Sequence, residues 1–276
     1  MLQHNIVLLV VTASLFAVGY MYYESRGPSL KTNECDPVVA QVLQKPPSQF
    51  SSCESFYLDV GSNIGVQIRK LYEPHRYPGA EMLKVFNDVF GQNRSKVCAI
   101  GIEMNPLHTQ RLQELEDHYT GKCGYNVKIF KETAAAAQDG YVDFYTDMDA
   151  ANLEWGASTV YNTKNSAAKQ VRAMDISRFF LEEVLPFAQT VVMKLDVEGA
   201  ETTVLPRLIA SGALCRMDTL LIEQHYSGLD KQQAAVLTST MQLFPSFFTA
   251  ASCKIQVMNL DDESFLHDAD ATINTC

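Results

Sequence analysis

Residues 56–65 read FYLDVGSNIG, and this stretch decides the fold because an apolar run meets a glycine turn. Phe56–Val60 predicts a buried strand, and Val66–Tyr72 after the turn predicts a helix. Gly61 and Gly65 allow the backbone to turn sharply and to approach a ligand, to which the next helix offers free N–H groups. The stretch predicts a cofactor-binding turn, and a purely structural joint between strand and helix is the alternative.

Four further apolar runs alternate with longer segments of helical character: Val97–Ile102, Val127–Phe130, Thr190–Leu195 and Thr219–Glu223. Such alternation is typical of an α/β fold in which helices cover both faces of a mostly parallel sheet. We therefore expect one domain built around that sheet.

The segments outside this alternation have a different pattern. Tyr141–Tyr145 and Ala157–Tyr161 predict short strands, and Asp175–Val184 predicts an amphipathic helix. We expect this middle part to be an excursion over the active-site edge of the sheet. Cys253–Leu260, after the aromatic stretch Phe244–Phe248, predicts a final antiparallel strand pair at the sheet edge.

The N-terminal segment Asn5–Tyr23 carries no charged side chain. As a helix it would span roughly 28 Å, which is close to the hydrocarbon thickness of a bilayer. We expect a tail at 1–4, a transmembrane anchor at 5–23, a stem at 24–54 and a folded domain at 55–276. A cleaved secretory signal is the alternative, although no basic region precedes the apolar run.

Seven cysteines and one acceptor sequon for N-linked glycans, Asn93-Arg94-Ser95, bear on the cellular location. Both are compatible with a single-pass protein whose domain 55–276 lies in the lumen of the ER or Golgi. The charges beside the apolar segment leave its orientation open. The alternative is that Cys98 is a buried thiol and that the sequon is unused. An odd number leaves at least one cysteine without an internal partner.

The net charge of -10 disfavours nucleic acid as a partner. Capture of nucleic acid needs clustered Lys and Arg side chains that displace the counterions of the phosphates. A small-molecule or glycan acceptor fits this composition better.

Glu103 follows the apolar run Val97–Ile102. At the carboxyl end of a strand, its carboxylate could accept hydrogen bonds from both hydroxyls of a ribose. The alternative is an exposed glutamate that caps a helix over Pro106–Tyr119. The spacing from Gly61 is about 40 residues, where a simple β-α-β unit uses roughly 20 to 30. This spacing predicts an insertion around Tyr72–Ser95.

Three carboxylates follow the apolar run Thr190–Leu195: Asp196, Glu198 and Glu201. Carboxylates crowded at a strand end can bind a cation, a substrate hydroxyl or the positive charge of a cofactor. The alternative is that Glu198 and Glu201 cap the helix Thr202–Ala210, because acidic residues suit a helix N-terminus. We expect both interpretations to hold in part.

Three sequence blocks occur in the order that is typical of the FkbM-type methyltransferases: Asp59–Gly65 (DVGSNIG), Glu103–Pro106 (EMNP) and Lys194–Glu201 (KLDVEGAE). From about Phe56 to His225 the chain resembles this family. The resemblance implies a Rossmann-like, seven-stranded class I methyltransferase fold. It also implies S-adenosyl-L-methionine as the methyl donor and a hydroxyl of a sugar or natural product as the usual acceptor.

The motifs and the resemblance together assign cofactor contacts to nine residues: Asp59, Gly61, Ser62, Asn63, Gly65, Glu103, Met104, Glu132 and Asp196. The family pattern has Ala at position 62 and Pro at position 104, and neither difference removes a contact. The resemblance also implies that the loop 132–135 passes the adenine and that Ser158 and Thr159 lie near the acceptor.

Methyl transfer is an in-line displacement that needs a well-placed acceptor and a general base. Asp196 or His225 is the expected base, since a histidine has an ordinary pKa of about 6.5. Glu198 and Glu223 would orient the acceptor or a metal, although the sequence carries no Cys/His zinc pattern and we assign no metal. The alternative for His225 is a histidine that closes a strand and bonds to the backbone.

Two other functions compete with a membrane-anchored methyltransferase that O-methylates a glycan or another small acceptor. A nicotinamide oxidoreductase would carry G-x-G-x-x-G, which this sequence lacks. A catalytically inactive, membrane-tethered scaffold would have lost the donor site, whereas the residues for that site are present.

Overall fold

The structure, a computed structural model, describes residues 48–149, 154–162, 164–260, 262–265, 273 and 276. The expected tail, the anchor at 5–23 and most of the stem at 24–54 lie outside these residues. Within the described ranges, no helix has the length and apolar character that crossing a bilayer requires.

The central sheet has six strands in the order β3-β2-β1-β7-β8-β9, and neighbouring strands are parallel throughout. Their bounds are β1 Ser55–Val60, β2 Val97–Ile102, β3 Val127–Phe130, β7 Thr190–Leu195, β8 Thr219–Ile222 and β9 Gln256–Asn259. In the register, Val60 aligns with Ile102 on one side and with Leu195 on the other. The carboxyl ends of β2, β1 and β7 therefore meet at one edge of the sheet.

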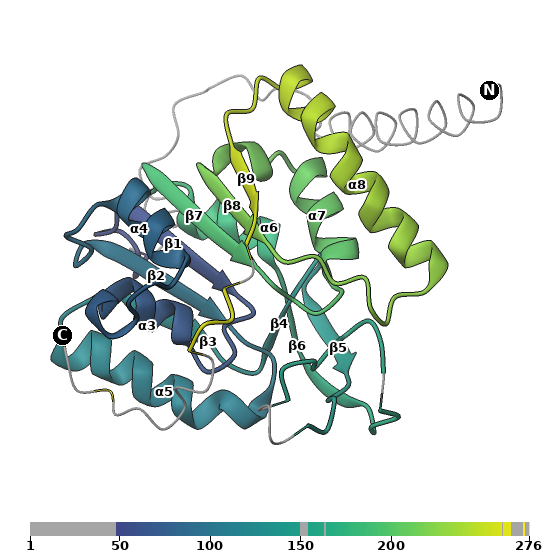
Figure 1. The fold of residues 1–276 in the computed structure, drawn as a ribbon, viewed down its shortest axis with the longest axis horizontal. Helices are drawn as coiled ribbons and strands as arrows, with labels where there is room; N and C mark the ends of the chain where they lie inside the picture. The colour runs from purple at the N-terminus through teal and green to yellow at the C-terminus, as the bar shows by residue number, and fades with distance from the viewer. Residues whose placement is uncertain (1–47, 150–153, 163, 261, 266–272, 274–275) are drawn as a thin grey trace, which may run out of the picture. The chain divides into compact units, whose positions relative to one another are not determined.

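Helices cover both faces of this sheet (Figure 1). One face packs against α3 (Val66–Tyr72), α4 (Met82–Phe90) and α5 (Thr109–Asp117). The other packs against α6 (Ile176–Phe179), α7 (Glu201–Ala210) and α8 (Lys231–Ala250). Because strand side chains alternate, Tyr57 joins the first apolar core, while Phe56 and Leu58 join the second. Burial on both faces explains why these strands read as continuous apolar runs.

Five short helical turns complete the described helices. Three are 3-10 turns at Pro74–Arg76, Pro106–His108 and Leu214–Arg216, and two are π-helical turns at His118–Lys122 and Phe180–Val184. The expected insertion Tyr72–Ser95 therefore folds as a turn followed by α4. The expected helix Asp175–Val184 begins at Ile176, because the Asp175 carboxylate accepts a hydrogen bond from the Arg178 N–H and caps it.

A second, three-stranded sheet lies beyond the main sheet, in the order β4-β6-β5 (Figure 1). Its strands are β4 Thr133–Ala136, β5 Gly140–Phe144 and β6 Lys169–Asp175. The strand expected at Tyr141–Tyr145 is present as β5. The strand expected at Ala157–Tyr161 is reduced to a single bridge between Tyr145 and Ser158. The segment 132–135, expected as a loop, mostly belongs to β4.

The C-terminal part differs from the prediction in two ways. Among the described residues the main sheet has six strands, not seven, and Cys253–Leu260 contributes one parallel strand in place of an antiparallel pair. The aromatic stretch Phe244–Phe248 lies inside α8, which begins with a capping box formed by Asp230 and Gln233. A helix between β8 and β9 returns the chain to the start of the sheet, and β9 therefore runs parallel to β8.

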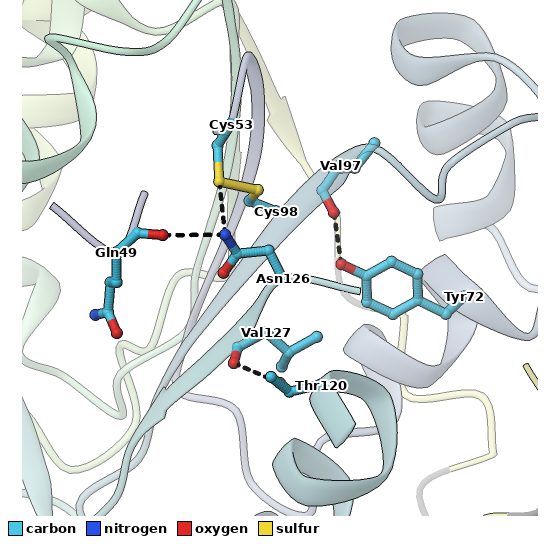
Figure 2. Close-up of a disulfide and its surroundings, with 8 residues drawn as sticks. All are labelled: Gln49, Cys53, Tyr72, Val97, Cys98, Thr120, Asn126 and Val127. Atoms are coloured by element: carbon cyan, nitrogen blue, oxygen red, sulfur yellow. Dashed lines mark hydrogen bonds between the residues drawn. A yellow bond between two sulfur atoms is a disulfide. The ribbon is translucent and has the colours of Figure 1, made fainter. Parts of the chain in front are cut away.

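Three disulfides join Cys53 to Cys98, Cys123 to Cys276 and Cys215 to Cys253. The first connects the segment before β1 to β2, so the interpretation of Cys98 as a free thiol is wrong. Figure 2 shows Asn126 beside this disulfide, with its amide nitrogen 3.1 Å from Cys53 Sγ and 3.2 Å from the Gln49 carbonyl oxygen. Cys35, the seventh cysteine, lies outside the described residues.

Candidate active site

A cleft of about 960 Å³, including solvent at its mouth, lies at the carboxyl ends of β1, β2 and β7. Its lining includes residues from all three sequence blocks, among them Gly61, Glu103 and Asp196. The cleft is therefore the place where the candidate residues can act together.

The two glycines of the turn have different roles. Gly61 has a φ of +88°, and a Cβ there would lie 1.7 Å from the Asp196 carbonyl oxygen. Only glycine allows β1 and β7 to end this close together. Gly65 has a φ of +80° and begins α3, where a Cβ would lie 2.9 Å from a methyl group of Leu115. Gly61 lines the cleft, whereas Gly65, which was also expected to contact the cofactor, is not part of the lining and lies against leucine side chains of α5.

Ser62 and Asn63 connect the turn to β2. The Ser62 hydroxyl donates to the Asp59 carbonyl oxygen at 2.7 Å and accepts from the Ile102 N–H at 3.1 Å. The Asn63 N–H donates to Glu103 Oε2 at 2.7 Å. Both residues line the cleft, and these bonds hold the turn in one conformation.

Glu103 lies at the end of β2 with its carboxylate fixed by the backbone. Besides the Asn63 N–H, the Asn105 N–H donates to it at 2.7 Å. Burial raises the pKa of Glu103 to about 7. The capping role that was the alternative belongs to Asn105, whose side chain accepts from the Leu107 N–H. Glu103 therefore presents a carboxylate to the cleft with capacity left for ribose hydroxyls.

Asp59 lies beneath the cleft and is not part of its lining. It is fully buried and accepts a hydrogen bond from the Tyr57 hydroxyl at 2.9 Å. Burial raises the pKa of Asp59 to about 6, although Lys194, its neighbour in the sheet register, opposes this shift. Lys194 lines the cleft in its place and pairs with Asp196. Asp59 therefore lies outside the cleft lining, and its direct contact with a methyl donor stays a prediction.

Gln67 and Asp262 are site residues that sequence reasoning missed. Gln67 lies in the first turn of α3, is 5% exposed and lines the cleft. Its side-chain N–H donates to the Asp262 carbonyl oxygen at 2.9 Å, while its Oε1 has no hydrogen-bond partner among the described residues. Asp262 is held by Lys70 Nζ at 3.1 Å and by the Met82 N–H at 2.9 Å. No short-range sequence signal links residues nearly 200 positions apart.

The side of the cleft where the sequence places an adenine agrees only in part with the expectation. Met104, Thr133 and Ala134 line it as expected. Glu132 does not, because its exposed carboxylate accepts a hydrogen bond from the Thr109 hydroxyl at 3.0 Å.

His108 and Trp155, which the sequence did not single out, also line this part of the cleft. Burial lowers the pKa of His108 to about 4, which keeps its ring neutral near pH 7. Trp155 is the single tryptophan of the chain. A neutral imidazole and an indole offer flat surfaces of the kind that stack on a purine.

His225 lies among four carboxylates. Its Nε2 is 3.1 Å from Glu223, 3.4 Å from Glu198 and 3.7 Å from Asp196, and its Nδ1 is 3.0 Å from Glu201. Burial alone would lower the pKa of His225, but the bonds to Glu201 and Glu223 and the other charges raise it to about 11. The ring is therefore a cation at neutral pH. Among the described residues its ring nitrogens lie beside carboxylates, in contrast to the backbone bond of the alternative, and the role of His225 as general base stays a prediction.

The sequence suggested two roles for Glu198 and Glu201, helix capping and ligand binding, and the structure assigns a different position to each residue. Glu201 is fully buried and accepts hydrogen bonds from the Val197 N–H at 3.0 Å and the Gly199 N–H at 2.9 Å. It is the structural residue at the start of α7. Glu198 lines the cleft, accepts from the Tyr161 hydroxyl at 2.7 Å, and has a pKa that burial raises to about 7.

The two residues expected near the acceptor, Ser158 and Thr159, have different positions relative to the cleft. Ser158 is fully buried, and its hydroxyl accepts from the Val160 N–H at 3.0 Å, so it organises the loop. Thr159 lines the cleft, as do Asp196 and Glu223. Side-chain atoms of Asp196, Glu198 and His225 come within 4.8 Å of one another, which is close enough to share a cation.

A family model described as "Methyltransferase FkbM domain" matches residues 59–271. Among solved structures, the chain is similar to a protein described as methyltransferase FkbM from Methylobacillus flagellatus KT, with 14% identity and a TM-score of 0.40. That match covers 76% of this chain and 44% of the other, so the chain spans less than half of the solved protein. No curated protein matches the chain.

The family model begins at the first sequence block and extends past the third. It covers well over half of the 276 residues, and the resemblance inferred from the three blocks is confirmed. The chain belongs to the methyltransferase FkbM family.

Proposed function

We propose that this domain transfers a methyl group from S-adenosyl-L-methionine to a hydroxyl of a glycan or another small acceptor. One observation carries the proposal. At the end of β2, the Glu103 carboxylate is fixed by two backbone N–H groups and faces a cleft beside a glycine turn. A carboxylate in this position is suited to accept hydrogen bonds from the 2′- and 3′-hydroxyls of a ribose.

The remaining lining residues suggest how the donor would lie. The adenine would stack near His108 and Trp155, while Glu103 holds the ribose. The aminoacyl end would then approach the turn and Gln67. The Gln67 Oε1 has no partner among the described residues, and the donor's ammonium group would satisfy this buried acceptor.

The acidic end of the cleft would receive the acceptor. In the transfer, the bond between sulfur and the methyl carbon breaks as the acceptor oxygen forms its bond to that carbon. The hydroxyl proton passes to a carboxylate, for which Asp196 and Glu198 are the candidates that line the cleft. His225, held by Glu201, would fix the positions of these carboxylates through its positive charge.

Calorimetric titration of the full chain with S-adenosyl-L-methionine tests the donor site. We expect saturable binding that Glu103→Ala weakens at least about tenfold, because two ribose hydrogen bonds are lost. Glu132→Ala is the matched control, since Glu132 is exposed and lies outside the cleft. An inactive scaffold without a donor site would show no saturable binding in the folded parent, and that result would refute the proposal.

We also propose that the apolar segment 5–23 tethers the chain to a membrane of the secretory pathway and that the catalytic domain is lumenal. Three disulfides support this location, because they persist in oxidising compartments and are rare in the cytosol. Protease protection of the domain in sealed microsomes tests the proposal. Digestion of the domain without detergent would contradict it.

A further inference from the structure

The sequon Asn93-Arg94-Ser95 lies in the connection between α4, which ends at Phe90, and β2, which begins at Val97. Asn93 and Ser95 are exposed. An acceptor asparagine must be reachable by a bulky glycan, and a surface connection meets that requirement. We propose that Asn93 is a site of N-linked glycosylation, an inference that rests on the lumenal location proposed above.

The local geometry of the folded chain accommodates a glycan on the Asn93 side chain. The Ser95 hydroxyl donates to Asn93 Oδ1 at 2.7 Å. Because Oδ1 accepts this bond, the amide nitrogen, which is the atom that is modified, points away from the hydroxyl. The triplet thus carries its hydroxyl and amide side by side on the surface.

The position of Asn93 keeps a glycan away from the cleft. The sequon precedes β2, whereas the cleft lies at the carboxyl end of that strand. Six residues of strand separate the two ends by roughly 17 Å. A glycan at Asn93 therefore leaves the donor and acceptor sites open.

Burial of Arg94, the central residue of the triplet, indicates at which stage the glycan is added. Arg94 is 4% exposed, and its guanidinium donates to the carbonyl oxygens of Gly91 at 3.1 Å and Leu71 at 3.2 Å. Four residues later, Cys98 is fixed by its disulfide to Cys53. The folded chain cannot extend this triplet into a transferase site, so the glycan is added during synthesis, before β2 joins the sheet.

The reaction requires an oligosaccharide carried on a lipid diphosphate as co-reactant, and the transferase is a membrane-bound enzyme of the same compartment. The Asn93 amide nitrogen forms a bond to the anomeric carbon of the sugar. The bond between that carbon and the diphosphate oxygen breaks, the lipid diphosphate leaves with the electron pair, and the amide loses one proton.

The test is expression of the full chain in eukaryotic cells, followed by electrophoresis before and after treatment with a peptide-N-glycosidase. We expect the glycosidase to increase the electrophoretic mobility of the parent by the equivalent of one glycan. The mobility of Asn93→Gln should not change. Ser95→Ala should lose the shift as well, while Ser95→Thr, which restores the hydroxyl, should keep it. The exposed position of Asn93 means that these variants fold, which their disulfide pairing can verify.

A control sequon separates failure of the site from failure of the proposed location. Ala167→Thr completes an acceptor triplet at the exposed Asn165, and we place it in the Asn93→Gln background. An unshifted parent with a shifted control would overturn the Asn93 site while leaving the domain lumenal. An unshifted parent and an unshifted control would overturn both. Neither result bears on methyl transfer, which the donor titration tests.

Discussion

At the residue scale, Glu198 links the geometry of the cleft to a measurable pH dependence. Burial raises the pKa of Glu198 to about 7, so the fraction of proton-accepting carboxylate increases as the pH rises through that value. With a hydroxyl acceptor obtained by screening, we expect the methylation rate to increase about tenfold per pH unit below 7 and to level off above it. Initial rates across this range measure the effect.

The variant Glu198→Gln keeps the shape of the side chain and removes its proton-accepting role. We expect it to flatten the pH profile and to lower the plateau by about 10² to 10⁴. If the variant keeps the parent profile, Glu198 is not the base, and Asp196 becomes the candidate.

Gln67 provides a second prediction at this scale. Gln67→Ala should weaken the binding of S-adenosylhomocysteine about tenfold and leave the affinity for 5′-methylthioadenosine unchanged, because only the first ligand carries the ammonium group. Calorimetry with both ligands measures the difference. Gln110→Ala, on the exposed side of α5, is the control. Equal weakening of both ligands would place Gln67 elsewhere in the donor site.

At the scale of elements, Gly61 controls how closely β1 and β7 end together. Gly61→Ala places a Cβ 1.7 Å from a backbone oxygen, and we expect it to cost at least about 4 kcal/mol of unfolding free energy. Gly79→Ala is the matched control, because its φ of +84° is similar and no atom lies within 4 Å of the added Cβ. The control should cost only about 1 to 2 kcal/mol. Similar losses in denaturant titrations of both variants would contradict this account of the turn.

The strands of the main sheet could be predicted because both of their faces are buried. Continuous apolar runs identified β1, β2, β3, β7 and β8, and the carboxylates at their ends located the cleft. The strand β6 could not be found in this way, since its burial alternates and Lys169 and Gln170 are exposed. The direction of β9 depended on α8, whose aromatic residues resemble a strand when they are read locally.

The site was predictable where a residue acts through its position at a strand end. Glu103 and Asp196 are examples, and both line the cleft. The pKa of His225 was not predictable, because it depends on four carboxylates that tertiary structure brings together. For the same reason, the pairing of Gln67 with Asp262 required the folded chain.

At the scale of the whole molecule, disulfides connect distant parts of the chain. Cys53 and Cys98 are 45 positions apart, and their bond restricts the unfolded chain. Cys53→Ser combined with Cys98→Ser should lower the unfolding free energy by about 2 to 5 kcal/mol. Thermal unfolding of the parent and the double variant, both without reductant, measures the loss. An unchanged midpoint would show that this bond contributes no stability.

The central claim is that the cleft at the ends of β1, β2 and β7 holds a nucleoside methyl donor. A crystal structure of the protein with S-adenosylhomocysteine tests it most directly. We predict ribose hydroxyls within hydrogen-bond distance of the Glu103 carboxylate and an adenine beside Trp155. A ligand bound at another surface, or an empty cleft at saturating ligand, would contradict the account.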